Sequence, residues 1–335
     1  MTDLHEFIQR IPKAELHLHI EGCLEPELIL MLAGRNGISL KYQSAESMRE
    51  AYNFYHLQDF LDLYYESFSV LLNEQDFYDL TWAYLLKAKE NNIVHTEVMF
   101  DPQAHTSRGV PFSAVIGGIY RALTDGYDKL GISFKLIMSF LRHLNVEEGF
   151  KTLTEAEPFQ GWITAVGLDS SEKDFPPDLY ADLFDTAQEM GFLTVVHAGE
   201  EGPPEYIWAA LDLLKASRID HGNSCLEDPD LVDVLGIYEI PLTSCPLSNL
   251  KLNVIKSMAD HPLKEMMERG IKVTVNSDDP AFFGGYLNDN FIAAADALQL
   301  TREDIIQLVK NSFEAAFITD AEKKGFLKKL EEASV

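Results

Sequence analysis

The chain contains 335 residues, with 27 Lys and Arg against 54 Asp and Glu, so its formal charge is −27 at pH 7. That charge repels phosphate backbones and anionic lipid headgroups, which argues against nucleic acid and membrane surfaces as partners. The length suits one large α/β barrel, and 46% hydrophobic residues exclude a largely disordered chain. Three cysteines without CxxC spacing, no apolar run of about 20 residues and no leader-like N-terminus predict a soluble protein of a reducing cytoplasm.

Short segments rich in β-branched and apolar residues recur along the chain, and most are separated by stretches with helical periodicity. We expect eight strands, at residues 14–20, 94–100, 133–140, 163–170, 192–199, 218–222, 240–246 and 272–279. From the second strand onward the intervals are about 30 residues, the length of a βαβ unit. This alternation predicts a (β/α)8 TIM barrel, and because no Pro/Gly/Ser-rich linker divides the chain we expect a single domain over residues 1–335.

The interval between the first two strands is more than twice as long and contains extra helices. One helix is expected over residues 60–72, where Phe60, Tyr64, Phe68 and Leu71 share a face. Helices inserted after the first strand of such a barrel lie near the mouth formed by the carboxyl ends of the strands. The pattern is consistent with a lid over a substrate and equally with padding at the barrel edge.

Catalytic residues of such barrels lie at the carboxyl ends of the strands, and several of the expected strands end in polar residues. The first strand ends with His17 and His19, whose spacing of two points both imidazoles into the barrel. The fifth delivers His197 and, three residues later, Glu200, and the sixth ends in His221. A lone histidine at a strand end is often a core residue, but several such ends meeting at one mouth predict a reaction centre.

The eighth expected strand ends in two adjacent carboxylates, Asp278 and Asp279. An extended chain directs them differently, and spacing alone does not decide which of them is a ligand. Three neutral imidazoles and one carboxylate suit one Zn²⁺ per chain, although iron or manganese fits the same ligands. Zinc lowers the pKa of a bound water toward about 7. Glu200 and His221 remain as a general acid/base pair that moves protons.

The other histidines stand in helical or turn-like contexts. His143 follows the third expected strand and is nearest to the mouth, where a supporting role is open to it. The rest are expected to be surface or structural residues, namely His5, His56, His95, His105 and His261.

Five motifs in order resemble those of the adenosine/adenine deaminases of the amidohydrolase superfamily. They are KAELHLHIEG at 13–22, HAGE at 197–200, IDHG at 219–222, SCPLSN at 244–249 and SDDP at 277–280. The motifs extend over nearly the whole chain. The resemblance implies a (β/α)8-barrel hydrolase with one zinc ion and a small purine as substrate.

The resemblance also implies roles for individual residues. The residues that resemble the zinc ligands are His17, His19, His197 and Asp278. Glu200 resembles the residue that protonates purine N1 during attack on C6, and His221 resembles the base that orients and deprotonates the attacking water. Asp279 resembles the carboxylate that contacts the purine.

Two positions favour the adenine deaminase branch of this family. Glu21 stands where adenosine deaminases typically carry a shorter Asp that helps to bind the ribose. The turn containing Ser170 and Ser171 resembles the adenine branch, whereas adenosine enzymes carry a longer turn that contains glycine. A longer acid and a polar turn fill space that a ribose requires. The resemblance therefore implies conversion of adenine to hypoxanthine and ammonia in purine salvage, with these three residues at the substrate.

Three alternatives stay open at this point. Adenosine or another 6-substituted purine keeps the same mechanism with a different substrate. A hydrolase with two metals bridged by a carboxylated lysine fits poorly, because the fourth strand ends Leu168-Asp169-Ser170 without a lysine. A catalytically silent purine-binding barrel usually loses a ligand or an acid/base group, and all are present here. The sequence carries no signal for the oligomeric state.

Overall fold

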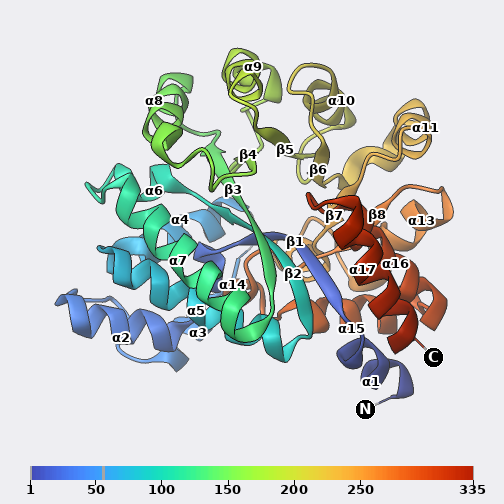
Figure 1. Cartoon of the computed structure of the whole chain (residues 1–335), viewed down its shortest axis with the longest axis horizontal. Helices are drawn as coiled ribbons and strands as arrows, with labels where there is room; N and C mark the ends of the chain where they lie inside the picture. The colour runs from blue at the N-terminus through green and yellow to red at the C-terminus, as the bar shows by residue number, and fades with distance from the viewer. Residues whose placement is uncertain (1, 55–56, 335) are drawn as a thin grey trace.

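The computed structural model describes residues 2–54 and 57–334, so His56 lies outside the described residues. Eight parallel strands follow one another around one sheet in chain order (Figure 1). A further parallel bridge between Leu18 and Asp278 joins the loop after the last strand to the first strand. The expected (β/α)8 barrel is confirmed. The strands are β1 (Lys13–His19), β2 (Ile93–Phe100), β3 (Ser133–Leu141), β4 (Ala165–Asp169), β5 (Leu193–Ala198), β6 (Arg218–His221), β7 (Leu242–Ser244) and β8 (Val273–Val275).

The helices surround the barrel, and α8 to α11 form one arc outside β3 to β6 in Figure 1. In chain order they are α1 (Asp3–Arg10), α2 (Pro26–Asn36), α3 (Ala45–Ala51), α4 (Leu57–Ser67), α5 (Glu74–Glu90), α6 (Pro102–Thr106), α7 (Phe112–Leu130), α8 (Val146–Ala156), α9 (Ala181–Glu189), α10 (Pro204–Asp212), α11 (Pro229–Ile237), α12 (Pro246–Lys251), α13 (Leu263–Glu268), α14 (Pro280–Phe283), α15 (Leu287–Leu298), α16 (Arg302–Ala315) and α17 (Asp320–Ala333).

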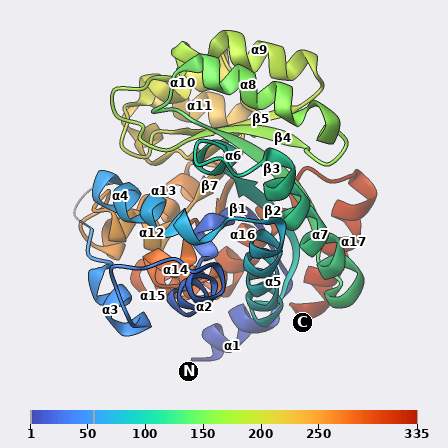
Figure 2. The same cartoon turned by 90° about the vertical axis from the view of Figure 1, so that its left-hand side faces the viewer.

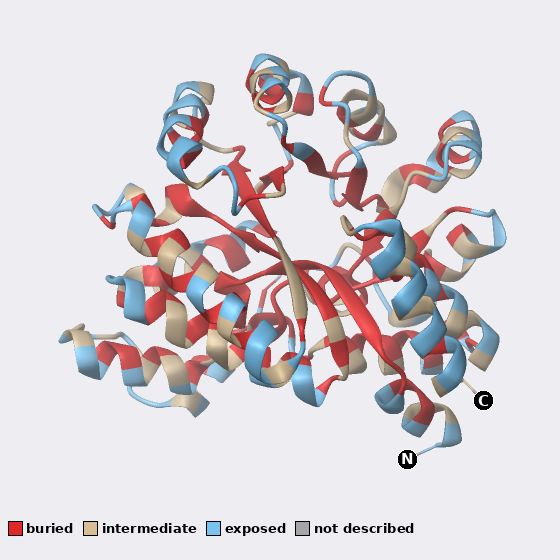
Figure 3. Cartoon of the chain, viewed as in Figure 1, coloured by how far each residue is buried: buried red, intermediate tan, exposed pale blue. Residues whose placement is uncertain are grey.

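Most strand residues are buried on both faces of the sheet, which Figure 3 shows as largely red strands. The surrounding helices carry both buried and exposed residues. Sheets of this kind carry near-continuous apolar runs because helices cover the outer face and side chains fill the interior. Inside the barrel, a small apolar cluster contains Met99, Ile137 and Val195. Arg218 of β6 pairs with Glu97 of β2 at 2.7 Å, with both side chains fully buried. The barrel is thus a filled core, and open space is found at its mouth.

Several strands are shorter than the sequence predicts, because the chain bends where the polar residues begin. β8 ends at Val275, so both carboxylates of its motif lie in the following loop. Asp278 and His221 adopt positive φ angles of 64° and 65°, which ordinary residues rarely do outside functional or tightly packed turns. The loop still pairs with the first strand, since the Asp278 amide donates to the His17 carbonyl at 3.2 Å.

The segment between β1 and β2 contains α2 to α5, with the short 3₁₀ turns η1 (Glu21–Cys23) and η2 (Phe68–Val70). The helix expected over residues 60–72 is present as α4, which begins earlier and ends at Ser67. Figure 1 and Figure 2 show α2, α3 and α4 on the same side of the barrel. Among the described residues, no helix is both long enough and apolar enough to cross a bilayer.

Candidate active site

A cavity opens at the carboxyl ends of the strands, where the active sites of such barrels lie. One wall is apolar and comes from α4. This inserted helix therefore lies over the mouth of the barrel and does more than fill its edge. The other walls carry ionisable groups from the strand ends. The residues that line the cavity are His19, Leu57, Phe60, Leu61, Tyr64, Tyr65, Asp101, Asp169, Ser170, His197, Glu200, His221, Leu252, Asp278, Asp279 and Phe283.

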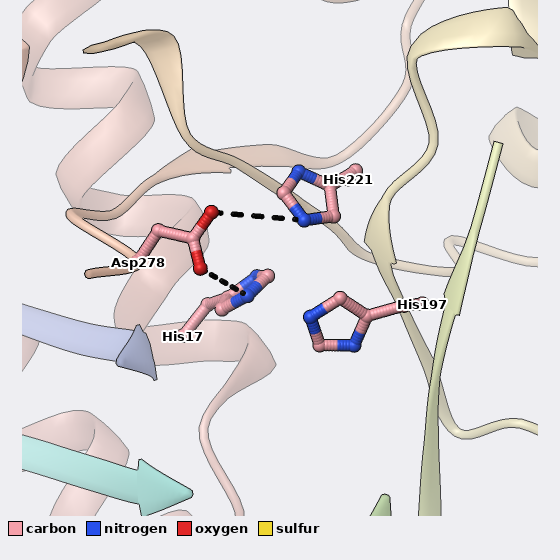
Figure 4. Close-up of side chains that lie close together, drawn as sticks. All are labelled: His17, His197, His221 and Asp278. Atoms are coloured by element: carbon pink, nitrogen blue, oxygen red, sulfur yellow. Dashed lines mark ion pairs between the residues drawn. The ribbon is translucent and has the colours of Figure 1, made fainter. Parts of the chain in front are cut away.

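The histidines and Asp278 meet around one point at the base of this cavity (Figure 4). The Asp278 carboxylate lies 3.4 Å from His17 Nε2 and 3.6 Å from His19 Nε2. His19 Nε2 in turn lies 3.2 Å from His197 Nε2. His17, His197, His221 and Asp278 form a group in which one potential ligand atom of each lies within 4.8 Å of the others. The structure therefore brings all four predicted ligands together, with His221 beside them.

The ring orientation of His17 is set by its hydrogen bonds. Thr243 donates its hydroxyl proton to Asp220 at 2.7 Å, so its oxygen accepts from His17 Nδ1 at 2.9 Å. A neutral His17 then carries its proton on Nδ1 and presents the lone pair of Nε2, which is buried without a hydrogen-bond partner among the described residues. Metal-binding histidines are commonly oriented by such carboxylate and hydroxyl groups. This donor set fits Zn²⁺.

Two further carboxylates stand behind the other imidazoles. Asp220 Oδ2 lies 3.5 Å from His197 Nδ1, and Asp169 Oδ2 lies 3.5 Å from His19 Nδ1. Burial lowers the pKa of His197 well below its usual value and that of His19 to about 4, which keeps both rings neutral as metal ligation requires. The orienting acids are part of the site, although sequence reasoning assigned them no role.

Glu200 and His221, which the sequence predicts to be an acid/base pair, lie close together in the cavity. His221 Nε2 lies 3.6 Å from Glu200 Oε2 and 3.8 Å from Asp278 Oδ2. Burial, followed by the negative charge of Asp278, raises the pKa of Glu200 well above its usual range. Burial lowers the pKa of His221 to about 3. Glu200 therefore carries a proton that it can donate, while a ring nitrogen of His221 is unprotonated and can accept one. The two side chains are thus suited to proton transfers in opposite directions.

The expected substrate residues fall in different places. Asp279 and Ser170 line the cavity, and the Ser170 hydroxyl contacts His143 Nδ1 at 2.8 Å, which gives that histidine a supporting position near the mouth. Ser171 lines a separate outer cleft. Glu21 is fully buried behind the cavity, where its Oε1 accepts from the Asp101 amide at 3.1 Å. Neither Ser171 nor Glu21 is among the residues lining the cavity, so direct contact with a ligand does not follow from their positions.

The close approach of η1 to the eighth strand end depends on a glycine. A Cβ at Gly22 would lie 2.5 Å from Asp279 Cα, a separation that side chains do not tolerate. Gly22 therefore lets the first motif pack directly on the last one.

Sequence reasoning missed the aromatic wall from α4 and one acid, Asp101. The sequence predicts Tyr64 only as a position on a helix face, because an aromatic stripe is more often core than binding site, and it assigns no role to Tyr65. Asp101 stands directly after β2 and before Pro102, in the same acid-proline arrangement as Asp279 and Pro280. That repeated pattern at a strand end is the signal that points to it. Of the other expected structural histidines, His95, His105 and His261 are buried, as a structural role requires.

Comparison with known proteins identifies the family. The model of the family described as adenosine deaminase matches residues 12–333. The chain belongs to this family. It is 58% identical over 312 residues to an adenine deaminase of Stutzerimonas stutzeri, covering 93% of this chain and 99% of that protein. It is 55% identical over 325 residues to an adenine deaminase of Acinetobacter baylyi, covering 97% of this chain and 98% of the relative.

Two solved structures have the same architecture as this chain. The crystal structure of adenine deaminase from Arthrobacter aurescens superposes with a TM-score of 0.95 at 46% identity, covering 96% of this chain and 98% of that one. An amidohydrolase from Burkholderia ambifaria, solved with bound Zn, superposes with a TM-score of 0.91 at 24% identity, covering 100% of this chain and 94% of that one. At that identity the second likeness concerns the fold alone.

Proposed function

We propose that this protein is a zinc-dependent adenine deaminase, which converts adenine and water to hypoxanthine and ammonia and so recovers a purine base in salvage. The observation that carries the proposal is the meeting of the histidine cluster with the Glu200–His221 pair in one cavity. The choice of adenine is supported by relatives of that name at 55% and 58% identity over nearly their full length.

His17, His19, His197 and Asp278 are the residues that would hold the zinc. Their donor set of three imidazole nitrogens and one carboxylate oxygen suits Zn²⁺, and the Nε2 atoms of the three rings approach one another and Asp278. Zinc bound there would lower the pKa of a water molecule toward about 7, which makes water a nucleophile at neutral pH. Support for zinc in particular comes from this ligand chemistry.

The chain's own residues move the protons. His221 orients the attacking water and takes a proton from it as the oxygen adds to C6 of the base. Glu200, protonated through burial, gives its proton to N1 of the ring. N1 thereby takes up the electron pair of the C6–N1 double bond as the oxygen adds. The amino group then leaves as ammonia after it gains from His221 the proton taken from water, and the carbonyl of hypoxanthine forms as the new hydroxyl returns a proton to Glu200.

The remaining walls select and hold a flat base. Asp279 lies beside the cluster, and burial together with the charge of Asp278 raises its pKa well above the usual range, so it donates a hydrogen bond to a ring nitrogen. The apolar residues of α4 and Phe283 cover the faces of the ring and exclude water from the reacting atoms. One domain carries all of these elements in this account.

The direct test is to incubate the zinc-loaded protein with adenine and to measure hypoxanthine and ammonia together. Equal molar formation of both products, abolished when the zinc is removed with a chelator and restored when it is returned, is the expected result. Product formation that persists without metal would contradict the assigned chemistry, and no turnover of adenine would contradict the assigned substrate.

A further inference from the structure

Asp101 is a buried acid that lines the cavity and takes no part in the metal cluster or the proton transfers described above. It follows β2 and precedes α6, yet its side chain makes no capping hydrogen bond to that helix. Only 2% of the residue is exposed, and its Oδ1 atom is buried without a hydrogen-bond partner in the described part of the chain. An unpaired buried oxygen costs free energy unless a ligand satisfies it.

A chain of hydrogen bonds holds this aspartate in place from behind. Its backbone amide donates to Glu21 Oε1 at 3.1 Å, and His105 Nε2 lies 2.9 Å from the same oxygen. Arg108 donates to His105 Nδ1 at 2.8 Å, so the neutral ring carries its proton on Nε2 and donates it to Glu21. Glu21 thereby holds the backbone of Asp101 in position. It affects the substrate cavity from behind the wall and not through direct contact with a ligand.

The position of Asp101 matches the far edge of a bound base. In an eight-stranded barrel with strands in chain order, β2 lies opposite β6, which carries His221. A purine whose N1 and C6 meet Glu200 and His221 extends its five-membered ring away from them, toward the opposite wall. Asp101, which follows β2, lines the cavity on that side.

The chemistry of this edge separates a free base from a nucleoside. The five-membered ring of free adenine carries an N–H at N9, whereas adenosine has a carbon in place of that hydrogen. We propose that Asp101 accepts a hydrogen bond from this N–H and thereby selects free bases over N9-substituted purines. The inference rests on the proposed function and adds its specificity-determining group. A carboxyl accepts such a bond in either protonation state, so the proposal does not depend on its charge.

The test compares adenine with 9-methyladenine, which lacks the N–H and adds one methyl group. A site built around a substrate N–H rejects an analogue without it by about 10²-fold or more, so the wild-type protein is expected to prefer adenine by at least that ratio of kcat/KM. In Asp101→Ala, kcat/KM for adenine falls by about 10-fold or more while that for 9-methyladenine does not fall. The preference therefore drops by about 10-fold or more.

Two further variants separate recognition from structural damage. Asp101→Asn keeps a carbonyl acceptor and is expected to retain most of the preference, whereas Lys173→Ala, at an exposed position in the outer cleft, leaves it unchanged. A variant that lowers both substrates equally, with the preference intact, would overturn the role of Asp101. Failure of the wild-type protein to deaminate adenine would instead overturn the proposed function, and with it this inference.

Discussion

Asp278 and Asp279 are adjacent in the chain, yet the pKa values of their carboxyls shift in opposite directions. Burial alone would raise both, but His17 and the neighbouring imidazoles hold the pKa of Asp278 well below its usual range. The pKa of Asp279 rises well above its usual range because it is buried next to the charge of Asp278. The Asp278 carboxyl is therefore an ionised partner for a cation, and the Asp279 carboxyl is a protonated hydrogen-bond donor. The two adjacent residues are thus suited to different roles.

Removing His197 tests the metal cluster. In His197→Ala, we expect bound zinc and deaminase activity to be lost together, because its Nε2 lies 3.2 Å from that of His19 at the centre of the cluster. Metal content per chain is measured by atomic emission beside the activity, with His5→Ala at the periphery as the matched control. A variant that keeps one zinc per chain would refute the assignment of His197 as a ligand.

Glu200 tests the proton transfer separately from the metal. Glu200→Gln preserves shape and removes the proton donor, so the variant is expected to keep its zinc while kcat falls by about 10²-fold or more. The neighbouring Glu201→Gln, on the exposed side of the turn, is expected to stay within twofold of wild type. A near-normal rate for Glu200→Gln would rule out its role as the general acid.

Asp220 tests the support behind the imidazoles. It accepts from Thr243 and lies 3.5 Å from His197, so Asp220→Asn loosens the orientation of two rings at once. Changes of this kind typically lower metal affinity by about 10- to 100-fold. Competition with a zinc chelator measures the affinity, and Asp212→Asn at the end of α10 serves as the control. Unchanged affinity in Asp220→Asn would show that the rings need no such support.

Lys13 predicts a pH dependence of stability that is independent of the active site. Its Nζ donates to the carbonyls of Ile8 and Ile11 at 2.7 Å, and burial lowers its pKa from 10.5 to about 7. Between these two values the unfolded chain binds more protons at this position than the folded one, so the contribution of Lys13 to stability rises with pH.

Urea unfolding at several pH values between 7 and 10 measures this contribution. The free energy of unfolding of wild type minus that of Lys13→Met is expected to increase with pH, by at most about 1.4 kcal/mol per unit. Lys328→Met, at an exposed position, is expected to give a flat difference. Parallel profiles for wild type and Lys13→Met would mean that Lys13 has an ordinary pKa in the folded protein.

The features predicted correctly from the sequence are those that repeat along the chain or lie within one motif. The spacing of the strands predicts the barrel, and the alternation around His17 and His19 predicts that both rings point inward. Hydrogen bonds between residues on strands far apart in the chain leave no repeating pattern in the sequence. The Thr243 hydroxyl on β7 donates to Asp220 on β6 and accepts from His17 on β1, and these two bonds exist only once the barrel closes.

The placement of Glu21 illustrates the same limit. Its length relative to the usual aspartate indicates that it alters the ribose region, but the sequence does not reveal that Asp101 stands between it and the cavity. The exact ends of β8 and α4 were likewise mispredicted, because the bend at Asp278 and the break at Phe68 depend on packing against other elements.

The most direct test of the account compares adenine with adenosine at equal concentrations, using zinc-loaded wild-type protein and ultraviolet absorbance to follow deamination. We predict a kcat/KM for adenine at least about 10²-fold above that for adenosine. The reason is that the proposed acceptor, the buried Asp101 carboxyl, bonds to the N9–H group, which only the free base carries. Equal or faster turnover of adenosine would contradict the assignment of adenine as the substrate.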